Sequence, residues 1–436
     1  MAGKIIQLIK RIISDRSKND PSLAVFIRTK IALKGINPDK YHPDSEDDPL
    51  VIEKLLALAK ELHISLNKSY TKQVYSTQKT AEEAVLDIKS QLQNFDPRML
   101  LFFSSPTYNP EVVNRALQSG FAASVVFGCT TAGEIIDGRL FNNSIVAMAF
   151  NSEVIEDVKL ETIENIKEED SINKAFRSFE DYYGESAVNM DFSKYVGIIL
   201  MDGLSMLEER VMDKIGDLTN VIFIGGSAAD NLEFIRTSVY GNGKVYHHGA
   251  VLALLKPKSK FDIIKTQSFR SLGKTLVATR VNEAAREVLE FNHKPAAQAY
   301  AEALGVPVHD ISGHFLNHPV GLIVGDDIYV RSPQRLKGDT IIFYCNILEG
   351  MEVSLLESID IVKDTKQAID AKKAELGNIS ALINFQCILR TLELQQKGCI
   401  QNYESLFAEI PTIGFSTYGE AYVGHINQTS TMLVFA

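Results

Sequence analysis

The chain has 436 residues, of which 45% are hydrophobic, and this is enough for two or three globular domains with sizeable cores. Its formal net charge of −10 argues against nucleic acid as a partner, and no cluster of lysine and arginine reverses that charge locally. No apolar run approaches the roughly 18 residues that a spanning helix needs. Four cysteines without metal or disulfide spacing indicate reduced thiols in a cytoplasmic protein.

Residues 1–70 are predicted to form a helical extension. Ile5, Ile9 and Ile12 fall on one helical stripe, and Asp48-Pro49 marks the start of a helix that continues through Leu62. We expect this segment to pack on the body of the protein or on a partner helix and to mediate assembly, with a homo-oligomer as a candidate state. Attachment to a membrane surface is the alternative interpretation.

The rest of the chain contains a threefold internal repeat. The heptad GCTTAGE at 128–134 reappears as GFSTYGE at 414–420, and a looser copy, IGGSAADN, lies at 224–231. Each copy combines an apolar strand, a helix pattern, a glycine-rich turn and a hairpin. Repeated units of this kind pack face to face, so we expect the three turns to cluster in space. The predicted fold is a mixed α/β layered sandwich of strand–helix–turn–hairpin units, preceded by the helical extension.

Further elements are predicted outside the repeated turns. An amphipathic helix is predicted at 77–95, before the first repeat. The polar segment KPKSK at 256–260 marks a domain boundary, which gives domains at 77–256 and 257–436. The second half is predicted to hold strands at 261–266, 275–281, 321–330 and 340–344 and helices at 295–304 and 358–375.

The repeated turns supply the candidate ligand contacts. Glycine-rich backbone at strand ends is a frequent ligand site, although the turns can also be purely structural. A carboxylate is not required by a tight turn, and in the middle copy we place Asn231 at the position of the repeated glutamates. Arg390 is a candidate clamp for a carboxylate or phosphate, or else the ion-pair partner of Glu420 or Glu134. The candidate ligand contacts are Cys129, Thr130, Thr131, Glu134, Arg390, Thr417 and Glu420.

Histidines supply the candidate metal ligands. His314 and His318 belong to the densest histidine cluster, HDISGHFLNH at 309–318, and imidazole binds zinc or haem iron. A polar surface loop is the alternative interpretation of this cluster. His247, His248 and His425 are further candidates. No c-type attachment sequence is present, so any haem is expected to be held non-covalently.

Signatures of common enzymes are missing. The chain lacks a Walker A loop, a G-x-S-x-G elbow, an HExxH motif and a G-x-G-x-x-G loop after a strand. Cys129 is a candidate nucleophile only if a basic group lowers its pKa, and no histidine is near it in sequence. An enzyme that uses Cys129, Glu134 or Glu420 therefore remains an alternative to a binding protein.

Several of these segments together resemble the FIST domain family. The resemblance rests on VVFGCTTAGEI, IGGSAADN, TSVYGNGKVYHHGAVLALL, KPAAQAYAEALG, YVRSP and GFSTYGEAYVGHINQTSTMLVF, and it covers the chain from about residue 77 to the end. It implies N- and C-terminal FIST halves and a sensory input domain that binds a small ligand, for which amino acids are candidates. Histidine kinases, diguanylate cyclases and chemotaxis proteins are the implied partners.

One bacterial branch of the family is a haem-binding nitric oxide sensor that regulates a separate histidine kinase. The present chain has a similar build, because it carries no kinase, cyclase or receptor module of its own. The resemblance therefore makes haem a candidate cofactor and nitric oxide a candidate signal. It does not assign the axial ligand to a particular histidine.

Overall fold

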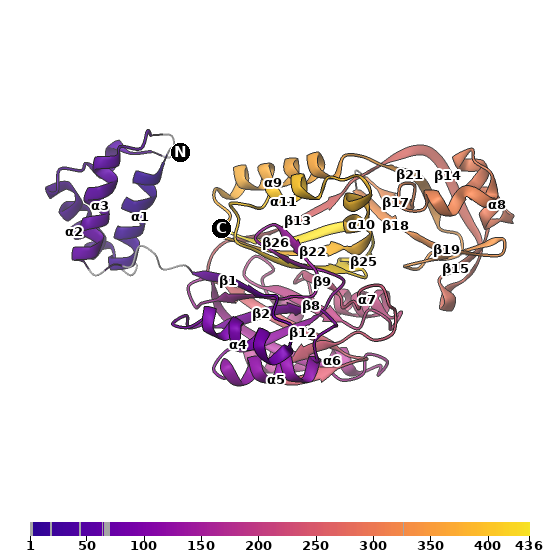
Figure 1. Ribbon diagram of the computed structural model, residues 1–436, viewed down its shortest axis with the longest axis horizontal. Helices are drawn as coiled ribbons and strands as arrows, with labels where there is room; N and C mark the ends of the chain where they lie inside the picture. Colours follow the sequence, from indigo (N-terminus) through magenta and orange to yellow (C-terminus); the bar gives the residue numbers. More distant parts are fainter. Residues whose placement is uncertain (1–2, 18–19, 43–44, 63, 65–69, 326) are drawn as a thin grey trace. The chain divides into compact units, whose positions relative to one another are not determined.

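The computed structural model describes residues 3–17, 20–42, 45–62, 64, 70–325 and 327–436. The chain divides into two compact units, residues 1–69 and residues 70–436, and each is described by itself (Figure 1). In these described ranges, no helix is both long and apolar enough to cross a membrane.

The N-terminal unit is helical, as the sequence predicts. Two helices begin with proline, where the missing N–H costs nothing, and aspartates cap them: Asp20 accepts from the Ser22 amide (2.8 Å) and Asp48 from the Leu50 amide (2.9 Å). The predicted isoleucine stripe of the first helix is buried in a core of its own. The elements are α1 (Lys4–Ser17), α2 (Pro21–Leu33), η1 (Pro38–Lys40) and α3 (Pro49–Glu61).

Three six-stranded sheets with the same strand order form the body of the second unit. In each sheet an antiparallel edge pair is followed by a parallel pair and then by a short hairpin. The first sheet contains β1 (Thr71–Ser76), β6 (Ile145–Phe150), β2 (Met99–Ser104), β3 (Val125–Thr130), β10 (Val239–Gly241) and β11 (Lys244–Tyr246). The second contains β7 (Ile155–Ile163), β12 (Ala250–Pro257), β8 (Val196–Met201), β9 (Phe223–Ser227), β24 (Glu420–Tyr422) and β25 (Gly424–Ile426). The third contains β13 (Phe261–Gln267), β26 (Thr429–Phe435), β22 (Ala381–Cys387), β23 (Thr412–Thr417), β4 (Glu134–Ile136) and β5 (Arg139–Phe141).

The hairpins are exchanged between repeats. The hairpin of the first repeat, β4–β5, joins the third sheet; that of the second, β10–β11, joins the first sheet; and that of the third, β24–β25, joins the second sheet. The exchange is cyclic, so each repeat completes the sheet of another. No local sequence pattern indicated this arrangement.

The pairing register corrects the predicted equivalence of the middle turn. Glu134 pairs with Phe415 and Glu420 with Gly226, each one residue beyond a glycine at the centre of the accepting strand. The corresponding residue of the middle repeat is Val239, which pairs with Cys129. It is therefore not Asn231, which lies in a longer connection, residues 228–238, between β9 and β10.

A glycine in each sheet permits close approach of the parallel strands. A Cβ at Gly128, Gly225 or Gly414 would lie 1.8, 1.8 or 2.1 Å from a carbonyl oxygen of the neighbouring strand. Real side chains do not tolerate such distances. The repeated glycines are thus a packing requirement of the sheets.

The inner faces of the three sheets share one hydrophobic core, and helices cover their outer faces. This arrangement is the predicted layered α/β fold, visible in Figure 1 as helices on the outside of the stacked sheets. The predicted amphipathic helix at 77–95 is shorter, because Thr80 caps its start and Leu92 is its C-cap. The helices are α4 (Ala81–Gln91), α5 (Pro110–Gly120), α6 (Ser171–Tyr183), η2 (Ala187–Asn189), α7 (Glu208–Leu218), α9 (Ile361–Leu376), α10 (Ile388–Gln396) and α11 (Ile400–Ser405).

A separate antiparallel sheet is inserted into the third repeat, between β13 and β22, and has its own core. The predicted strand at 321–330 is wrong in detail, because a turn at Gly325 makes it a hairpin of two strands. The elements are β14 (Phe269–Asn282), η3 (Glu283–Ala285), β15 (Glu287–Phe291), β16 (Lys294–Pro295), α8 (Ala296–Leu304), η4 (Val308–His314), β17 (Val320–Val324), β18 (Asp327–Arg331), β19 (Pro333–Lys337), β20 (Thr340–Phe343) and β21 (Glu352–Ser358).

The predicted domain boundary at 256–260 coincides with the connection from β12 to β13. Because the hairpins cross it in both directions, residues on either side share sheets, and residues 70–436 form one compact unit. The division into 77–256 and 257–436 stays a prediction.

Candidate ligand-binding site

Buried carboxylates hold the first and third turns closed. Glu134 accepts hydrogen bonds from the Ser144 amide (3.1 Å) and hydroxyl (2.7 Å) and from the Thr131 hydroxyl. Glu420 accepts in the same way from the amide (3.1 Å) and hydroxyl (2.6 Å) of Thr429. Burial raises the pKa of Glu134 to about 7 and that of Glu420 to about 8. Ser144 and Thr429 are therefore the partners of the two repeated glutamates.

The other predicted turn contacts are also engaged by the protein itself. Cys129 is fully buried in the shared core, and burial raises the pKa of its thiol well above the usual value, which disfavours the nucleophilic thiolate. The Thr130 hydroxyl accepts from the Ser238 amide (3.0 Å), and the Thr417 hydroxyl donates to the Gly419 carbonyl (2.6 Å). A ligand-binding role for these residues stays a prediction.

Arg390 does not form the predicted ion pair. Its guanidinium is buried and donates to the hydroxyls of Ser268 and Thr365, both at 3.0 Å. Across the described ranges no carboxylate lies within ion-pair distance of it. The reason is geometric: α10 directs the side chain toward α9, while Glu134 and Glu420 are satisfied by amides and hydroxyls.

The three turns meet, which confirms that they cluster. Backbone hydrogen bonds join each pair of turns. Ser416 N donates to Gly133 O (2.7 Å) between the third and first turns, Ala229 N to Thr130 O (2.9 Å) between the second and first, and Ser227 N to Gly419 O (2.9 Å) between the second and third. All three repeats therefore contribute to one junction.

A cavity of about 370 Å³ opens at this junction, and we call it the junction cavity. All fourteen residues that line it are uncharged: Ala132, Gly133, Leu140, Phe141, Asn142, Asn143, Asn231, Leu232, Ile388, Thr391, Leu392, Gln395, Ile400 and Ser416. Its volume lies within the roughly 300–1,000 Å³ typical of small-molecule sites. The sequence analysis singled out none of these residues as a ligand contact.

Polar groups continue beneath the floor of the junction cavity. Thr391 is hydrogen-bonded to Ser416 (2.9 Å) and accepts from the Gln386 side-chain amide (2.9 Å). Gln386 Oε1 and Asn384 Nδ2 are buried without a hydrogen-bond partner among the described residues. Unsatisfied buried polar atoms are uncommon in folded proteins, and a bound ligand or water is one way to satisfy such a network.

A second, smaller cavity of about 200 Å³ lies beside the first and shares Leu232 and Ile388 with it. We call it the His425 cavity. Burial lowers the pKa of His425, and its Nε2 is buried without a hydrogen-bond partner in the described ranges. At one wall Arg286 pairs with Glu208 (2.6 Å), which ties the inserted sheet to α7.

Of the five predicted haem ligands, His425 has the most suitable surroundings. A neutral imidazole with a free Nε2 beside an apolar wall is what an axial ligand requires. The cavity volume is nevertheless below the roughly 300 Å³ at which drug-sized sites begin. A haem macrocycle therefore does not fit this cavity in the conformation observed.

His314 and His318 lie together in the inserted segment, with ring centroids 5.5 Å apart. Burial, together with His314, lowers the pKa of His318. Neither residue lines the junction cavity or the His425 cavity. Within the described ranges, no group of three or more His, Cys, Asp or Glu side chains is placed to hold a metal ion.

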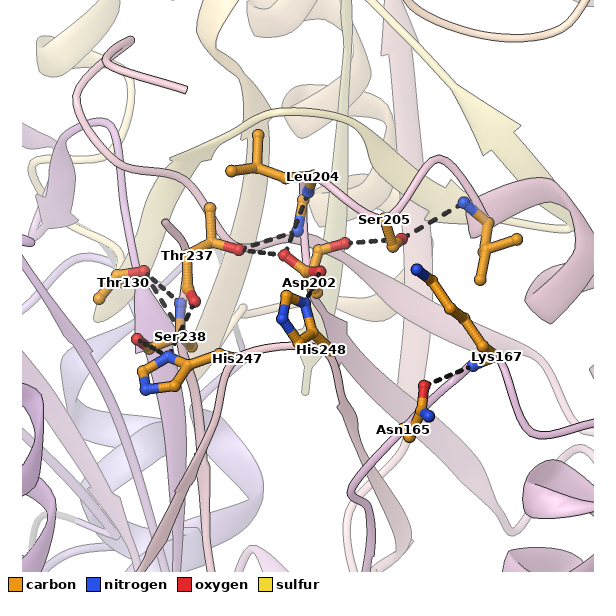
Figure 2. Close-up of polar contacts among 12 residues, drawn as sticks. Thr130, Asn165, Lys167, Asp202, Leu204, Ser205, Thr237, Ser238, His247 and His248 are labelled. Carbon is orange, nitrogen blue, oxygen red and sulfur yellow. Dashed lines mark hydrogen bonds and ion pairs between the residues drawn. The ribbon is translucent and has the colours of Figure 1, made fainter. Parts of the chain in front are cut away.

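His247 and His248 lie in a third recess, the Asp202 cleft, of about 160 Å³ (Figure 2). His248 Nδ1 is 3.5 Å from Asp202, and His247 Nδ1 is 3.0 Å from the Ser238 hydroxyl. The two adjacent histidines thus have different partners and do not form one metal site.

Two family descriptions match the chain: the FIST N domain over residues 98–294 and the FIST C domain over residues 296–422. An uncharacterized protein of Methanocaldococcus jannaschii is 26% identical over 272 residues, which are 57% of this chain and 52% of the relative. The chain thus spans about half the length of this curated relative. The solved structure of T. maritima PurL complexed with ADP is 10% identical, with a TM-score of 0.17 over 84% of this chain and 71% of that one, and this similarity is too low to carry an argument.

Proposed function

The chain belongs to the FIST family, whose domains sense small ligands in signalling proteins and are not catalytic, and from this premise we propose that the junction cavity binds a small uncharged organic ligand. The observation that carries the proposal is the cavity at the meeting point of all three repeats, with an entirely uncharged lining. A ligand there touches every repeat at once, so its binding can change their packing.

The lining narrows the chemistry of the ligand. Amides and hydroxyls from Asn142, Asn143, Thr391 and Gln395 offer hydrogen bonds, while leucine, isoleucine and phenylalanine side chains offer apolar contact. Transfer of an unpaired charge into such a site is costly. A free amino acid carries two charges that this cavity does not neutralise, so we favour a ligand with neutral polar groups and an apolar part.

The connection at residues 228–238 is the element that we propose relays occupancy. It contributes Leu232 to the junction cavity and to the His425 cavity, and Arg236 to the Asp202 cleft. Asn231, Leu232 and Phe234 have positive φ values of 56°, 67° and 54°, a conformation that costs Leu and Phe free energy. Asp230 holds this conformation by accepting backbone amides, among them those at 234 and 236, and the Tyr418 hydroxyl.

Part of the same connection is exposed and apolar. Ile235 is 76% exposed and Phe234 is 45% exposed. Exposed apolar side chains on a strained segment suit a surface that changes its partner contacts. We propose a histidine kinase, a diguanylate cyclase or a chemotaxis protein as the recipient of the signal, inside the cytoplasm.

The test is direct binding combined with blocking of the cavity. Native mass spectrometry of the purified full chain identifies a copurified ligand, and calorimetry measures its affinity. Leu392→Trp adds volume inside the cavity and should lower affinity at least tenfold. Leu86→Trp, on an exposed position of α4, is the matched control and should leave it unchanged. Equal affinities of both variants and the wild type would show that the ligand binds elsewhere.

A haem-based sensor of nitric oxide is the second candidate, and the observation that favours it is the Nε2 of His425, which is buried without a hydrogen-bond partner among the described residues. Haem would require the His425 cavity to widen. The test is the absorption spectrum of protein purified with haem supplied, because a Soret band that is lost in His425→Ala supports haem binding at His425. A colourless protein would exclude haem and leave the organic ligand as the proposed signal at the junction cavity.

A further inference from the structure

We propose that the Asp202 cleft is a second ligand site and that it binds the phosphate group of a small anion, either free phosphate or a phosphomonoester. This proposal is independent of the ligand in the junction cavity. The chain as a whole has a net charge of −10, whereas the formal charge of the residues that line this cleft is positive.

Basic side chains dominate the lining of this cleft. Lys167 and Arg236 line it together with His247 and His248, and Asp202 is the single acidic residue of the lining. Both Lys167 and Arg236 are exposed, and neither has an ion-pair partner in the described part of the chain. Cations without acidic partners, gathered around a recess, favour binding of an anion.

Asp202 is the one group in the lining that opposes an anion, and its carboxylate is directed toward neighbouring groups of the protein. Its Oδ1 accepts from the Thr237 hydroxyl and the Leu204 amide (3.1 Å), and its Oδ2 faces His248 Nδ1 at 3.5 Å. Figure 2 shows these contacts of Asp202 with Thr237, Leu204 and His248. Asp202 faces Nδ1 of His248, and when the imidazole is protonated its Nε2–H is available to donate to a ligand.

The backbone that carries the basic residues is held by hydrogen bonds. The Ile166 amide donates to the His248 carbonyl (3.0 Å), and Asn165 Oδ1 accepts from the Lys167 amide (3.1 Å). In the connection 228–238, the Arg236 amide donates to Asp230 (2.8 Å). The backbone positions from which the Lys167 and Arg236 side chains extend are therefore fixed on both sides of the cleft.

The size of the cleft limits the ligand. A volume of about 160 Å³ accommodates one phosphate group with a short organic tail.

The cleft is also connected to the junction. Ser238, which contacts His247, forms two hydrogen bonds with Thr130 of the first turn. The Thr130 amide donates to the Ser238 carbonyl (2.9 Å), and the Ser238 amide donates to the Thr130 hydroxyl (3.0 Å). Arg236 belongs to the same connection, 228–238, that lines the junction cavity. Binding of an anion can therefore influence the element that we propose as the relay.

Calorimetric titration of the full chain with inorganic phosphate and with glycerol phosphate, at constant ionic strength, tests the proposal. The double variant Lys167→Gln/Arg236→Gln should bind the better of the two probes at least tenfold more weakly than the wild type. Arg115→Gln/Lys260→Gln removes the same charge from exposed positions outside the cleft and is the matched control. It should retain wild-type affinity.

The two probes separate the two sources of phosphate. Tighter binding of glycerol phosphate identifies a phosphomonoester, and tighter binding of inorganic phosphate identifies the free ion. The proposal is overturned if the wild type binds neither probe, or if the cleft variant and the control variant lose affinity equally.

Discussion

The first and third repeats differ from the middle repeat in the residues that stabilise the turn. In the first and third repeats a buried glutamate bonds to a Ser or Thr at the start of the closing strand, and the turn is short. In the middle repeat Val239 replaces the glutamate and Gly249 the hydroxyl residue, and the connection 228–238 extends away from the sheet. The difference indicates that two repeats maintain the junction while the middle one supplies a segment that reaches three cavities.

The largest effect is expected for the strand glycine that all three repeats share. Gly414→Ala should lower the free energy of unfolding by more than about 3 kcal/mol, because the new Cβ would lie 2.1 Å from the Asn384 carbonyl oxygen. Gly216→Ala, in an exposed helical position without neighbours within 4 Å, should instead be neutral or stabilising by up to about 1 kcal/mol. Urea unfolding followed by circular dichroism measures both. Equal midpoints would refute the packing role of the repeated glycine.

The next largest effect is expected for the buried glutamate, which only the first and third repeats have. Glu420→Ala leaves the amide and hydroxyl of Thr429 buried without partners, which should cost about 2–4 kcal/mol of unfolding free energy. The exposed Glu352→Ala is the control and should change it by less than about 0.5 kcal/mol. If the two variants are equally stable, the glutamate does not hold the turn.

The same carboxyls predict a dependence of stability on pH. Their pKa values in the folded protein, about 7 for Glu134 and about 8 for Glu420, exceed the usual 4.5. The unfolded chain therefore loses these protons first, and the free energy of unfolding should fall as pH rises from about 4.5 through about 8. Glu420→Gln removes one of the two titrations and should show a weaker dependence between about pH 5 and pH 8. Parallel urea midpoints for variant and wild type across that range would contradict this.

The smallest expected effect distinguishes the hairpins themselves. The first and second hairpins turn at Asp137-Gly138 and Asn242-Gly243, residues that tolerate positive φ, whereas the third turns at Val423 with φ of 59°. Val423→Asn should raise the free energy of unfolding by about 1 kcal/mol. Val324→Asn, at a similarly exposed position that lacks positive φ, should bring no gain. A gain in both variants would point to a surface effect instead of relief of strain.

Much of the fold followed from local patterns. Apolar runs predicted the strands, and the Asp48-Pro49 step predicted the start of a helix in the N-terminal unit. The repeated glycines and glutamates predicted that the turns converge. The ion pair predicted as one alternative for Arg390 was wrong, because Glu134 and Glu420 are satisfied by other groups and its partners, Ser268 and Thr365, lie in the inserted segment and on α9. A role as a ligand clamp stays a prediction.

The sequence predicted where the candidate site lies but not which side chains line it. The turns can form a site only if the three sheets meet, and the repeated pattern indicated that they do. Which side chains line the cavity depends on α10 of the third repeat, on the hairpin of the first and on the connection of the second. These segments are far apart in the chain, and their proximity carries no local signal.

The three repeats, the helical extension and the turns could be recognised in the sequence, because they depend on periodicity and on interactions within a few residues. The exchange of hairpins between sheets, the equivalence of Val239 with Glu134 and the absence of charge from the junction cavity lining became known only from the folded chain. The physical reason is that strand pairing between distant segments is selected by the packing of the whole core, and a hairpin has the same local pattern whichever sheet accepts it.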